Sequence, residues 1–277
     1  MAKYKGAMPK LPERGYFKKG DKGAEVEKLQ KALNWANSGT IVAPLKIDGI
    51  VGNLTIAQVS FFEEIHHKTI DGAFGKVCLN TLKALNMTGA WRACNWAVSV
   101  AKDNRFTYGA GQRAHRSGCY FCQTNTGPRM KRKEKKGEPH VVKDKNGNGH
   151  TYEMTYCCNT FVTAAYAHGA KDKKIYSICH GGSCCGMSPS DWTRSPNFKN
   201  MGEAKKLPFK DLKAGDVIMN TGKVGAGHVW LYLGGDRYVE AANGGWGAES
   251  IKSKSGAKAY YSKYQKYSVC KVVRYTA

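Results

Sequence analysis

The spacing of apolar residues in the first third of the chain predicts three short helices. Between residues 24 and 35, Val26, Leu29 and Leu33 recur every three or four positions, so they fall on one face of a helix. Two later segments show the same spacing, with apolar positions at Ile56, Val59, Phe62 and Ile65 and at Cys78, Leu82 and Leu85. The pattern therefore predicts a small helical unit of roughly 70 residues.

A short motif precedes each of the last two predicted helices. Ile47–Gly52 reads IDGIVG, and Ile70–Gly75 reads IDGAFG. An Asp side chain accepts hydrogen bonds from nearby backbone N–H groups and Gly adopts positive φ without strain, so each copy predicts a turn. Together with the leading stretch Gly20–Leu33, the two turns resemble the three-helix peptidoglycan-binding domain of many bacterial and phage wall hydrolases. The resemblance covers residues 15–87 and implies binding to bacterial peptidoglycan.

Beyond a boundary near residues 86–90 the pattern becomes a mixture of helices and strands. A helix is predicted at residues 91–102. Strand-like apolar runs lie at 212–219, 228–233, 237–242 and 268–275. We therefore predict an α+β fold for residues 92–277.

Two segments of this second region lack a regular pattern. Residues 112–155 read as an insertion, within which Val141-Val142 and Thr151–Thr155 predict a hairpin around Asn146–Gly149. Residues 171–209 are rich in Cys, Gly, Ser and Pro, which predicts that they are mostly loop.

Cys158 begins one of the predicted helices in this region. Apolar residues follow it at helical spacing, at Phe161, Val162, Ala165 and Tyr166, and Gly169 ends the helix. The partial positive charge at the start of a helix lowers the pKa of a thiol and favours the reactive thiolate. Cys158 is therefore a candidate nucleophile, although most free cysteines are simply small core residues.

His228 begins a predicted strand with alternating side chains. Trp230 and Tyr232 share its face, and we expect Val229, Leu231 and Leu233 to point to the opposite, core side. A histidine at the entrance of a strand can reach a helix N-terminus and act as the base that a nucleophilic cysteine needs.

A third residue is expected to orient His228 through its second ring nitrogen. If a three-residue loop joins the two strands, Glu240 lies diagonal to His228 on the same face. If the loop has two residues, Asn243 lies directly opposite His228. Turn length decides between Glu240 and Asn243, and it stays open at this point.

The order of these motifs resembles the NlpC-type and CHAP-type papain-like peptidoglycan hydrolases. The matching motifs are Tyr108-Gly109, the helix start at Cys158, Leu212–Val217 and Gly227–Gly234. The resemblance implies a papain-like domain from about residue 92 onward, in which a helix packs on a small antiparallel sheet. It implies that Cys158 is the nucleophile, His228 the base and Glu240 the orienter. It also matches Tyr108 to the tyrosine that helps to hold the stem peptide.

The chain departs from the family pattern in three places. Cys157 stands where an aspartate usually precedes the nucleophile, and the insertion lengthens the distance from Tyr108 to Cys158. The orienter of NlpC-type members is often histidine, whereas an acidic or amide residue is nearer to CHAP-type usage. These departures concern the third residue of the site and the distance of Tyr108 from Cys158.

The thiol chemistry requires no cofactor, but other cysteines allow a structural zinc site. Cys119 and Cys122 have the spacing of half a zinc site. Further candidate ligands are Cys179, Cys184 and Cys185. Free or disulfide-linked cysteines are the alternative, so no metal ligand is assigned.

Composition sets the expected partners and location. The chain has 44 Lys and Arg against 21 Asp and Glu, and this net charge of +23 favours polyanions such as anionic wall polymers. No apolar run approaches the roughly 18 residues of a membrane span, and no secretory signal is visible. We therefore expect no membrane insertion. We expect synthesis in a host cytoplasm and action on the cell wall after lysis, as in a phage endolysin.

Three functions follow from these observations. The leading hypothesis is an endopeptidase that hydrolyses an amide bond of peptidoglycan stem peptides. An N-acetylmuramoyl-L-alanine amidase of the same fold is the alternative. A basic, zinc-containing nucleic-acid-binding protein is the hypothesis from another class, but no interleaved aromatic and basic stripe supports it, so we expect no nucleic-acid partner.

Overall fold

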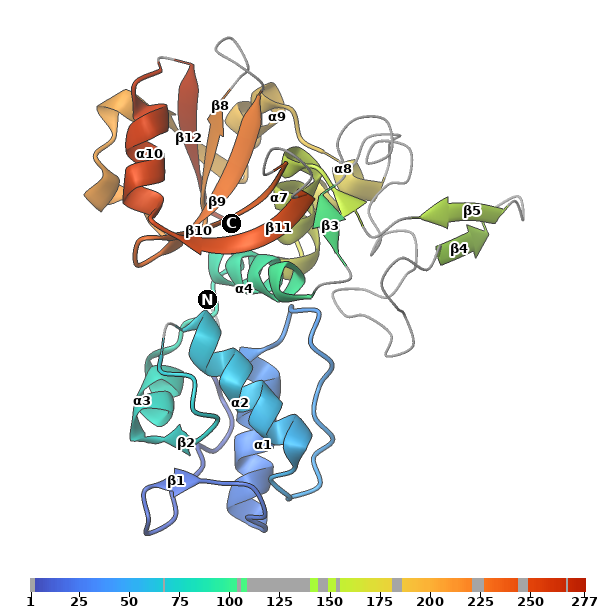
Figure 1. Cartoon of the computed structure of the whole chain (residues 1–277), viewed down its shortest axis with the longest axis vertical. Coiled ribbons are helices and arrows are strands. Elements are labelled where there is room, and N and C mark those ends of the chain that lie inside the picture. The colour runs from blue at the N-terminus through green and yellow to red at the C-terminus, as the bar shows by residue number, and fades with distance from the viewer. Residues whose placement is uncertain are drawn as a thin grey trace. The chain divides into compact units, whose positions relative to one another are not determined.

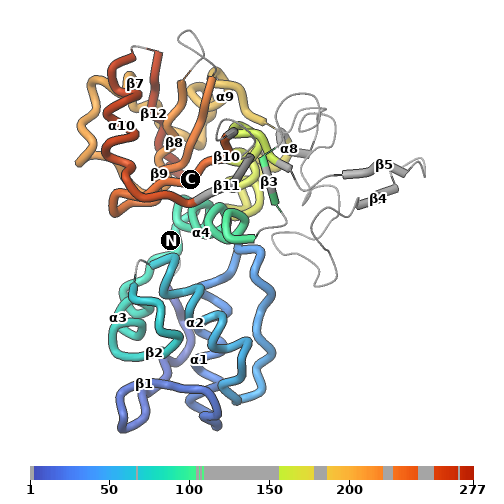
Figure 2. The backbone as a smooth tube through the Cα atoms, viewed as in Figure 1, coloured from blue at the N-terminus to red at the C-terminus, as the bar shows by residue number. Residues whose placement is uncertain are grey.

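The structure is a computed structural model, and most of the elements that it describes are labelled in Figure 1. It describes residues 3–66, 68–103, 106–108, 140–143, 149–152, 155–180, 186–220, 227–243, 249–267 and 269–277, whose backbone Figure 2 follows in colour. The chain divides into two compact units. Unit 1 comprises residues 1–38 and 42–88, and unit 2 comprises residues 39–41 and 89–277.

Unit 1 has a helix at each of the three predicted segments. These are α1 (Ala24–Ala36), α2 (Asn53–Ile65) and α3 (Lys76–Ala84), and two short strands, β1 (Tyr16–Phe17) and β2 (Phe74–Gly75), pair antiparallel. Their apolar faces meet in one core, in which Leu29, Leu33, Val59, Phe62, Phe74 and Leu82 are buried. Burial of these side chains is the main force that holds so small a unit together.

The two repeated motifs form the turns that the sequence predicts. Asp48 Oδ1 accepts a hydrogen bond from the N–H of Ile50 (3.0 Å), and Asp71 Oδ1 accepts one from Ala73 (2.8 Å). Gly49 and Gly72 have φ values of 68° and 69°, in the left-handed region that favours glycine. The repeat is therefore one local structure built twice.

Unit 2 is built on a six-stranded antiparallel sheet in the order β11-β10-β9-β8-β12-β7. The strands are β7 (Phe198–Glu203), β8 (Asp216–Asn220), β9 (His228–Gly234), β10 (Arg237–Asn243), β11 (Glu249–Ser255) and β12 (Cys270–Tyr275). Helix and sheet are combined in an α+β arrangement, in agreement with the predicted class (Figure 1).

Both faces of the sheet are covered. α4 (Gly89–Lys102) and α7 (Cys158–Ala164) pack against β9 and β10, whereas α10 (Ala257–Gln265) contributes Tyr261 to a second core with Trp230 and Tyr232. The expectation that only the odd-numbered face of β9 is core is therefore wrong, because α10 buries Trp230 and Tyr232 as well. This second layer matters for the site, since it lies on the face that carries His228.

The prediction that residues 171–209 are mostly loop is also wrong. This segment contains α8 (Lys173–His180), α9 (Pro189–Arg194), β7 and two 3₁₀ turns (Ala204–Lys206 and Phe209–Asp211). α9 and β7 are short, and their anchors Trp192 and Phe198 are single buried aromatics rather than periodic runs. Neither element therefore shows a repeating spacing of apolar residues that would predict it from the sequence.

Several shorter elements complete unit 2. After α7 the helix continues as a π-helix (Ala165–Gly169), so the predicted end at Gly169 is confirmed. β3 (Thr107–Tyr108) pairs parallel with β6 (Thr155–Tyr156), which leads directly into α7. β4 (His140–Lys143) and β5 (Gly149–Tyr152) form the predicted hairpin. Of the predicted insertion, residues 112–139, 144–148 and 153–154 lie outside the described residues.

No helix in the described part of the chain is both long and apolar enough to span a membrane.

Candidate active site

The start of α7 presents two adjacent cysteines in different settings. Cys157 is the N-cap residue, and its N–H donates a 2.9 Å hydrogen bond to Thr160 Oγ1. The Thr160 hydroxyl in turn lies 3.3 Å from Cys157 Sγ. Cys157 therefore occupies the N-cap position, at which aspartate is among the preferred residues. Cys157 is buried in the cap, and Cys158, the first helical residue, is the partly exposed thiol.

The thiol of Cys158 lies within hydrogen-bonding reach of the imidazole of His228. Burial alone would raise the pKa of Cys158. The hydrogen bond and charge of His228 act against burial, and so do the backbone N–H groups of Val229 and Asn159. As a result the pKa of Cys158 is lower than usual, which favours the thiolate.

The turn between β9 and β10 decides which residue reaches His228 from the other side. Arg237 pairs with Gly234, so the turn has two residues, Gly235 and Asp236, both with positive φ. A β-bulge then shifts the register, and Tyr238 pairs with Tyr232. The register beyond the bulge is therefore the one that the three-residue loop predicts.

Because of this bulge, Glu240 lies diagonal to His228. Glu240 Oε2 is 2.7 Å from His228 Nε2. The alternative position of Asn243 directly opposite His228 is wrong, since the register it requires holds only next to the turn. The side chain of Asn243 lies outside the described residues. Since an ionised carboxylate only accepts hydrogen bonds, Nε2 donates to Glu240 and Nδ1 is the nitrogen that remains for Cys158.

Glu240 is an ionised carboxylate inside the protein, with an exposed fraction of 3%. Burial would raise its pKa, but hydrogen bonds from His228, Lys254 and Tyr260 lower it to about 2. Burial likewise disfavours the imidazolium form of His228, but Cys158 and Glu240 raise the pKa of His228 to about 9. The lowered pKa of Cys158 and the raised pKa of His228 together favour a thiolate–imidazolium pair held by a carboxylate.

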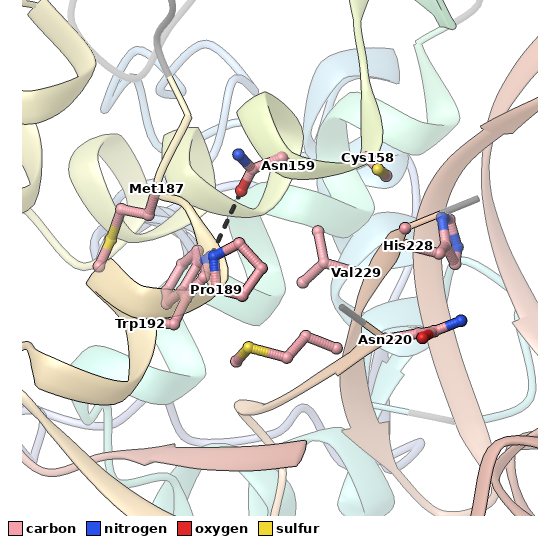
Figure 3. A pocket seen from close by; sticks show the side chains of 10 residues that line it. Cys158, Asn159, Met187, Pro189, Trp192, Asn220, His228 and Val229 are labelled. Atoms are coloured by element: carbon pink, nitrogen blue, oxygen red, sulfur yellow. Dashed lines mark hydrogen bonds between the residues drawn. The ribbon is translucent and has the colours of Figure 1, made fainter. Parts of the chain in front are cut away.

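A pocket of about 250 Å³ opens beside this pair. Figure 3 shows Cys158 and His228 at one end of the pocket and Met187 and Trp192 at the other. The remaining lining residues are Asn159, Pro189, Met219, Asn220, Gly227 and Val229. Most of the lining is apolar. Trp192 Nε1 donates a 3.3 Å hydrogen bond to Asn159 Oδ1, which ties the far wall of the pocket to the residue after Cys158.

The other predicted site residues fall in different places. Tyr108 is in β3, paired with Tyr156, two residues before Cys158, but it does not line the pocket described above. Among the described residues no group of three or more His, Cys, Asp or Glu side chains gathers at a potential metal site. The predicted zinc ligands cannot be placed, because Cys119, Cys122, Cys184, Cys185 and the side chain of Cys179 lie outside the described residues.

This geometry agrees with a comparison against known protein families. Residues 149–271 match the NlpC/P60 family. The matched segment contains Cys158, His228 and Glu240, and it supports a papain-like peptidoglycan hydrolase domain in this part of the chain. Searches of curated proteins and of solved structures gave no match.

The sequence analysis missed several residues that line or support this site. Trp192 and Pro189 come from α9, whose start carries a recognisable signal. Ser188 caps the helix, Pro189 follows, and Asp191 completes a capping box, with its N–H 3.2 Å from Ser188 Oγ. This capping pattern can be recognised from the sequence alone. Lys254 and Tyr260 lie on β11 and α10, which carry no comparable signal.

Proposed function

We propose that unit 2 is a cysteine hydrolase of peptidoglycan that uses Cys158 as nucleophile, His228 as general base and acid, and Glu240 as orienter. The observation that carries this proposal is the continuous chain of contacts from Cys158 through His228 to Glu240, beside an open pocket. The match of residues 149–271 to the NlpC/P60 family supports peptidoglycan as the substrate.

In this mechanism the Cys158 thiolate attacks the carbonyl carbon of a stem-peptide amide and forms a tetrahedral oxyanion. When the oxyanion collapses, the C–N bond breaks and the imidazolium of His228 donates its proton to the departing nitrogen. The product is a thioester on Cys158. Neutral His228 then takes a proton from water, the hydroxide attacks the thioester, and the C–S bond breaks. The thiolate and imidazolium are restored, and the carboxylic acid that leaves loses its proton to the solvent.

We propose that the enzyme is an endopeptidase, which cuts within the stem peptide. The pocket beside Cys158 is walled largely by Met187, Trp192, Met219 and Val229, which suits an apolar side chain of an amino acid next to the scissile amide. An amidase would instead have to place the lactyl group of the muramic acid there. The distinction lies in the groups released on digestion.

We also propose that unit 1 binds the wall and that the protein acts as an endolysin-like lytic enzyme, with a binding domain at residues 15–87 and the hydrolase at residues 92–277. Matched positions of the two repeat copies expose apolar side chains. Ile47 and Ile70 are 37% and 55% exposed, and Leu54 and Val77 are 58% and 61% exposed. Apolar groups exposed in matched pairs suit a ligand that is itself a repeating polymer.

Digestion of purified sacculi tests the proposed bond. Mass spectrometry of the soluble products should show muropeptides with new amino termini inside the stem peptide. Release of intact stem peptides that begin with alanine would show an amidase instead. The absence of any new amino terminus, with the protein folded and bound to the sacculi, would refute the proposed hydrolase.

A further inference from the structure

The carboxylate of Glu240 is held by more than His228. Its Oε1 accepts a 2.7 Å hydrogen bond from Lys254 Nζ, and its Oε2 accepts a 2.8 Å bond from Tyr260 as well as the bond from His228 Nε2. The three donors come from β9, β11 and α10. Both oxygens are therefore occupied, and rotation of the carboxylate away from His228 would break several bonds at once.

Tyr260 is itself fixed by aromatic neighbours. Its ring stacks on Tyr238 with centroids 4.5 Å apart and an interplanar angle of 15°, and it packs against Trp230 at 5.3 Å. The Tyr260 hydroxyl lies 3.2 Å from that of Tyr264, one turn further along α10. The ring therefore has little freedom, and its hydroxyl stays directed at Glu240.

Lys254 reaches the same carboxylate from the edge strand of the sheet. Its ammonium group lies 6.0 Å from the ring centroid of Tyr238, within range of a cation–π interaction. The Glu240 side chain is 3% exposed and that of Lys254 is 38% exposed, so the cation keeps contact with water while it neutralises a buried charge. This arrangement avoids the cost of burying both ions completely.

We propose that Lys254 and Tyr260 are positioning residues of the hydrolase, which hold the Glu240 carboxylate in place against His228. This inference rests on the proposed thiol mechanism and extends it to two elements outside the predicted site. The two residues act through Glu240 and do not touch the substrate. Their role is to keep the imidazole of His228 directed at Cys158 through the catalytic cycle.

The charged and titratable groups around Glu240 predict the direction in which removal of Lys254 shifts the pKa of His228. Glu240 is contacted by His228 of β9, by Lys254 of β11 and by Tyr260 of α10. The hydroxyl of Tyr264, also on α10, lies next to that of Tyr260, and Tyr238, on the same strand as Glu240, stacks on the Tyr260 ring. His228 faces Cys158 on its other side. The Lys254 ammonium lies 2.7 Å from Glu240 Oε1, so its removal takes a positive charge away from the surroundings of the imidazolium and should raise the pKa of His228.

The test compares five variants of the full-length protein, Cys158→Ala among them, by turnover on purified sacculi and by ¹⁵N NMR titration of the His228 imidazole. Lys254→Met should raise the pKa of His228 by about one pH unit, because a neighbouring cation is lost. It should also lower the saturating rate roughly tenfold, the rate equivalent of one hydrogen bond to a charged group. Lys254→Arg retains the charge and the donor, and it should restore both values.

Tyr260→Phe should lower the saturating rate roughly tenfold and leave the half-saturating amount of sacculi unchanged. Its matched control is Tyr261→Phe on the same helix, because Tyr261 donates to the carbonyl oxygens of Ala204 and Leu207 and not to Glu240. The control should lose thermal stability and keep the rate of its folded fraction.

A purely structural role for these residues predicts a different result. Lys254→Met and Tyr260→Phe would then lower the melting temperature but leave the saturating rate of the folded fraction unchanged, and this would overturn the positioning role alone. If Cys158→Ala retained the wild-type rate in the same assay, the proposed function would fail and the positioning role with it.

Discussion

Replacement of Glu240 by glutamine is the most informative perturbation of the site. Glu240→Gln keeps the size of the side chain but removes its charge and replaces one acceptor oxygen by an NH₂ donor. In the native site every neighbour of the carboxylate is a donor. Oε1 accepts from Lys254, and Oε2 accepts from His228 and Tyr260. Whichever way the amide is turned, its NH₂ group therefore faces at least one other donor.

The structure gives the size of the effect. A hydrogen bond to a charged group contributes about 1.5–3 kcal/mol, so the rate should fall roughly 10- to 100-fold. The His228 pKa of about 9 depends partly on Glu240. Loss of the negative charge should lower it by roughly one to two pH units, because a neighbouring opposite charge has this influence. The imidazolium should then lose its proton at a pH of about 7 to 8.

The assay is the initial rate of sacculus digestion between pH 5 and pH 10, expressed as the ratio of variant to wild type at each pH. The ratio removes the effect of pH on the wall itself. We expect the alkaline limb of the Glu240→Gln profile to move toward neutral pH, together with the fall in rate at the optimum. An unchanged alkaline limb in a folded variant would show that Glu240 does not support the imidazolium, and would refute this reasoning.

Three further predictions concern stability, the pocket and unit 1. Because the pKa of Glu240 lies near 2 instead of its usual 4.5, its hydrogen bonds contribute about 3 kcal/mol of stability above pH 4.5, which is lost as the pH falls toward 2. The raised pKa of His228 reflects its contacts with Cys158 and Glu240, so the stability that these contacts contribute is present below pH 6.5 and is lost as the pH rises through about 9. Chemical denaturation across this range should show both declines, and a flat profile would contradict them. Trp192→Ala removes a wall of the pocket and should raise the half-saturating amount of sacculi by a larger factor than it lowers the saturating rate. If the saturating rate fell by as large a factor as the half-saturating amount rose, Trp192 would also serve the chemical step. Leu54→Gln combined with Val77→Gln changes two exposed positions without adding charge and should weaken sedimentation of the protein with sacculi at an unchanged melting temperature. Undiminished binding would remove these side chains from the wall-binding surface.

The sequence contains enough information to locate the core of the site. Cys158 and His228 each stand at the start of a regular element, and the periodicity of those elements is legible in the chain. Glu240 was one of two possibilities, because the hydrophobic pattern fixes the face of a strand but not the length of a turn. The turn has two residues, as one alternative required, and a bulge then restores the register of the other. Sequence periodicity does not indicate such a bulge.

Local sequence patterns do not predict which residues surround Glu240. Lys254 is a polar residue of an edge strand, and Tyr260 stands on a helix with mixed apolar and charged residues, so neither has a distinctive spacing. Their function depends on contacts between β10, β11 and α10, which only the folded chain brings together. Trp192 was missed for another reason, since the composition of its segment suggested a loop although a capping box marks the start of α9.

The central claim is that the Cys158 thiolate breaks an amide bond of peptidoglycan. The most direct measurement is a count of the new amino termini that wild type and Cys158→Ala release from the same purified sacculi, with sedimentation of both proteins as the control for wall binding. The account predicts a steady release by the wild type and none by Cys158→Ala, which should still sediment with the sacculi. Release of amino termini by a folded Cys158→Ala protein would contradict it.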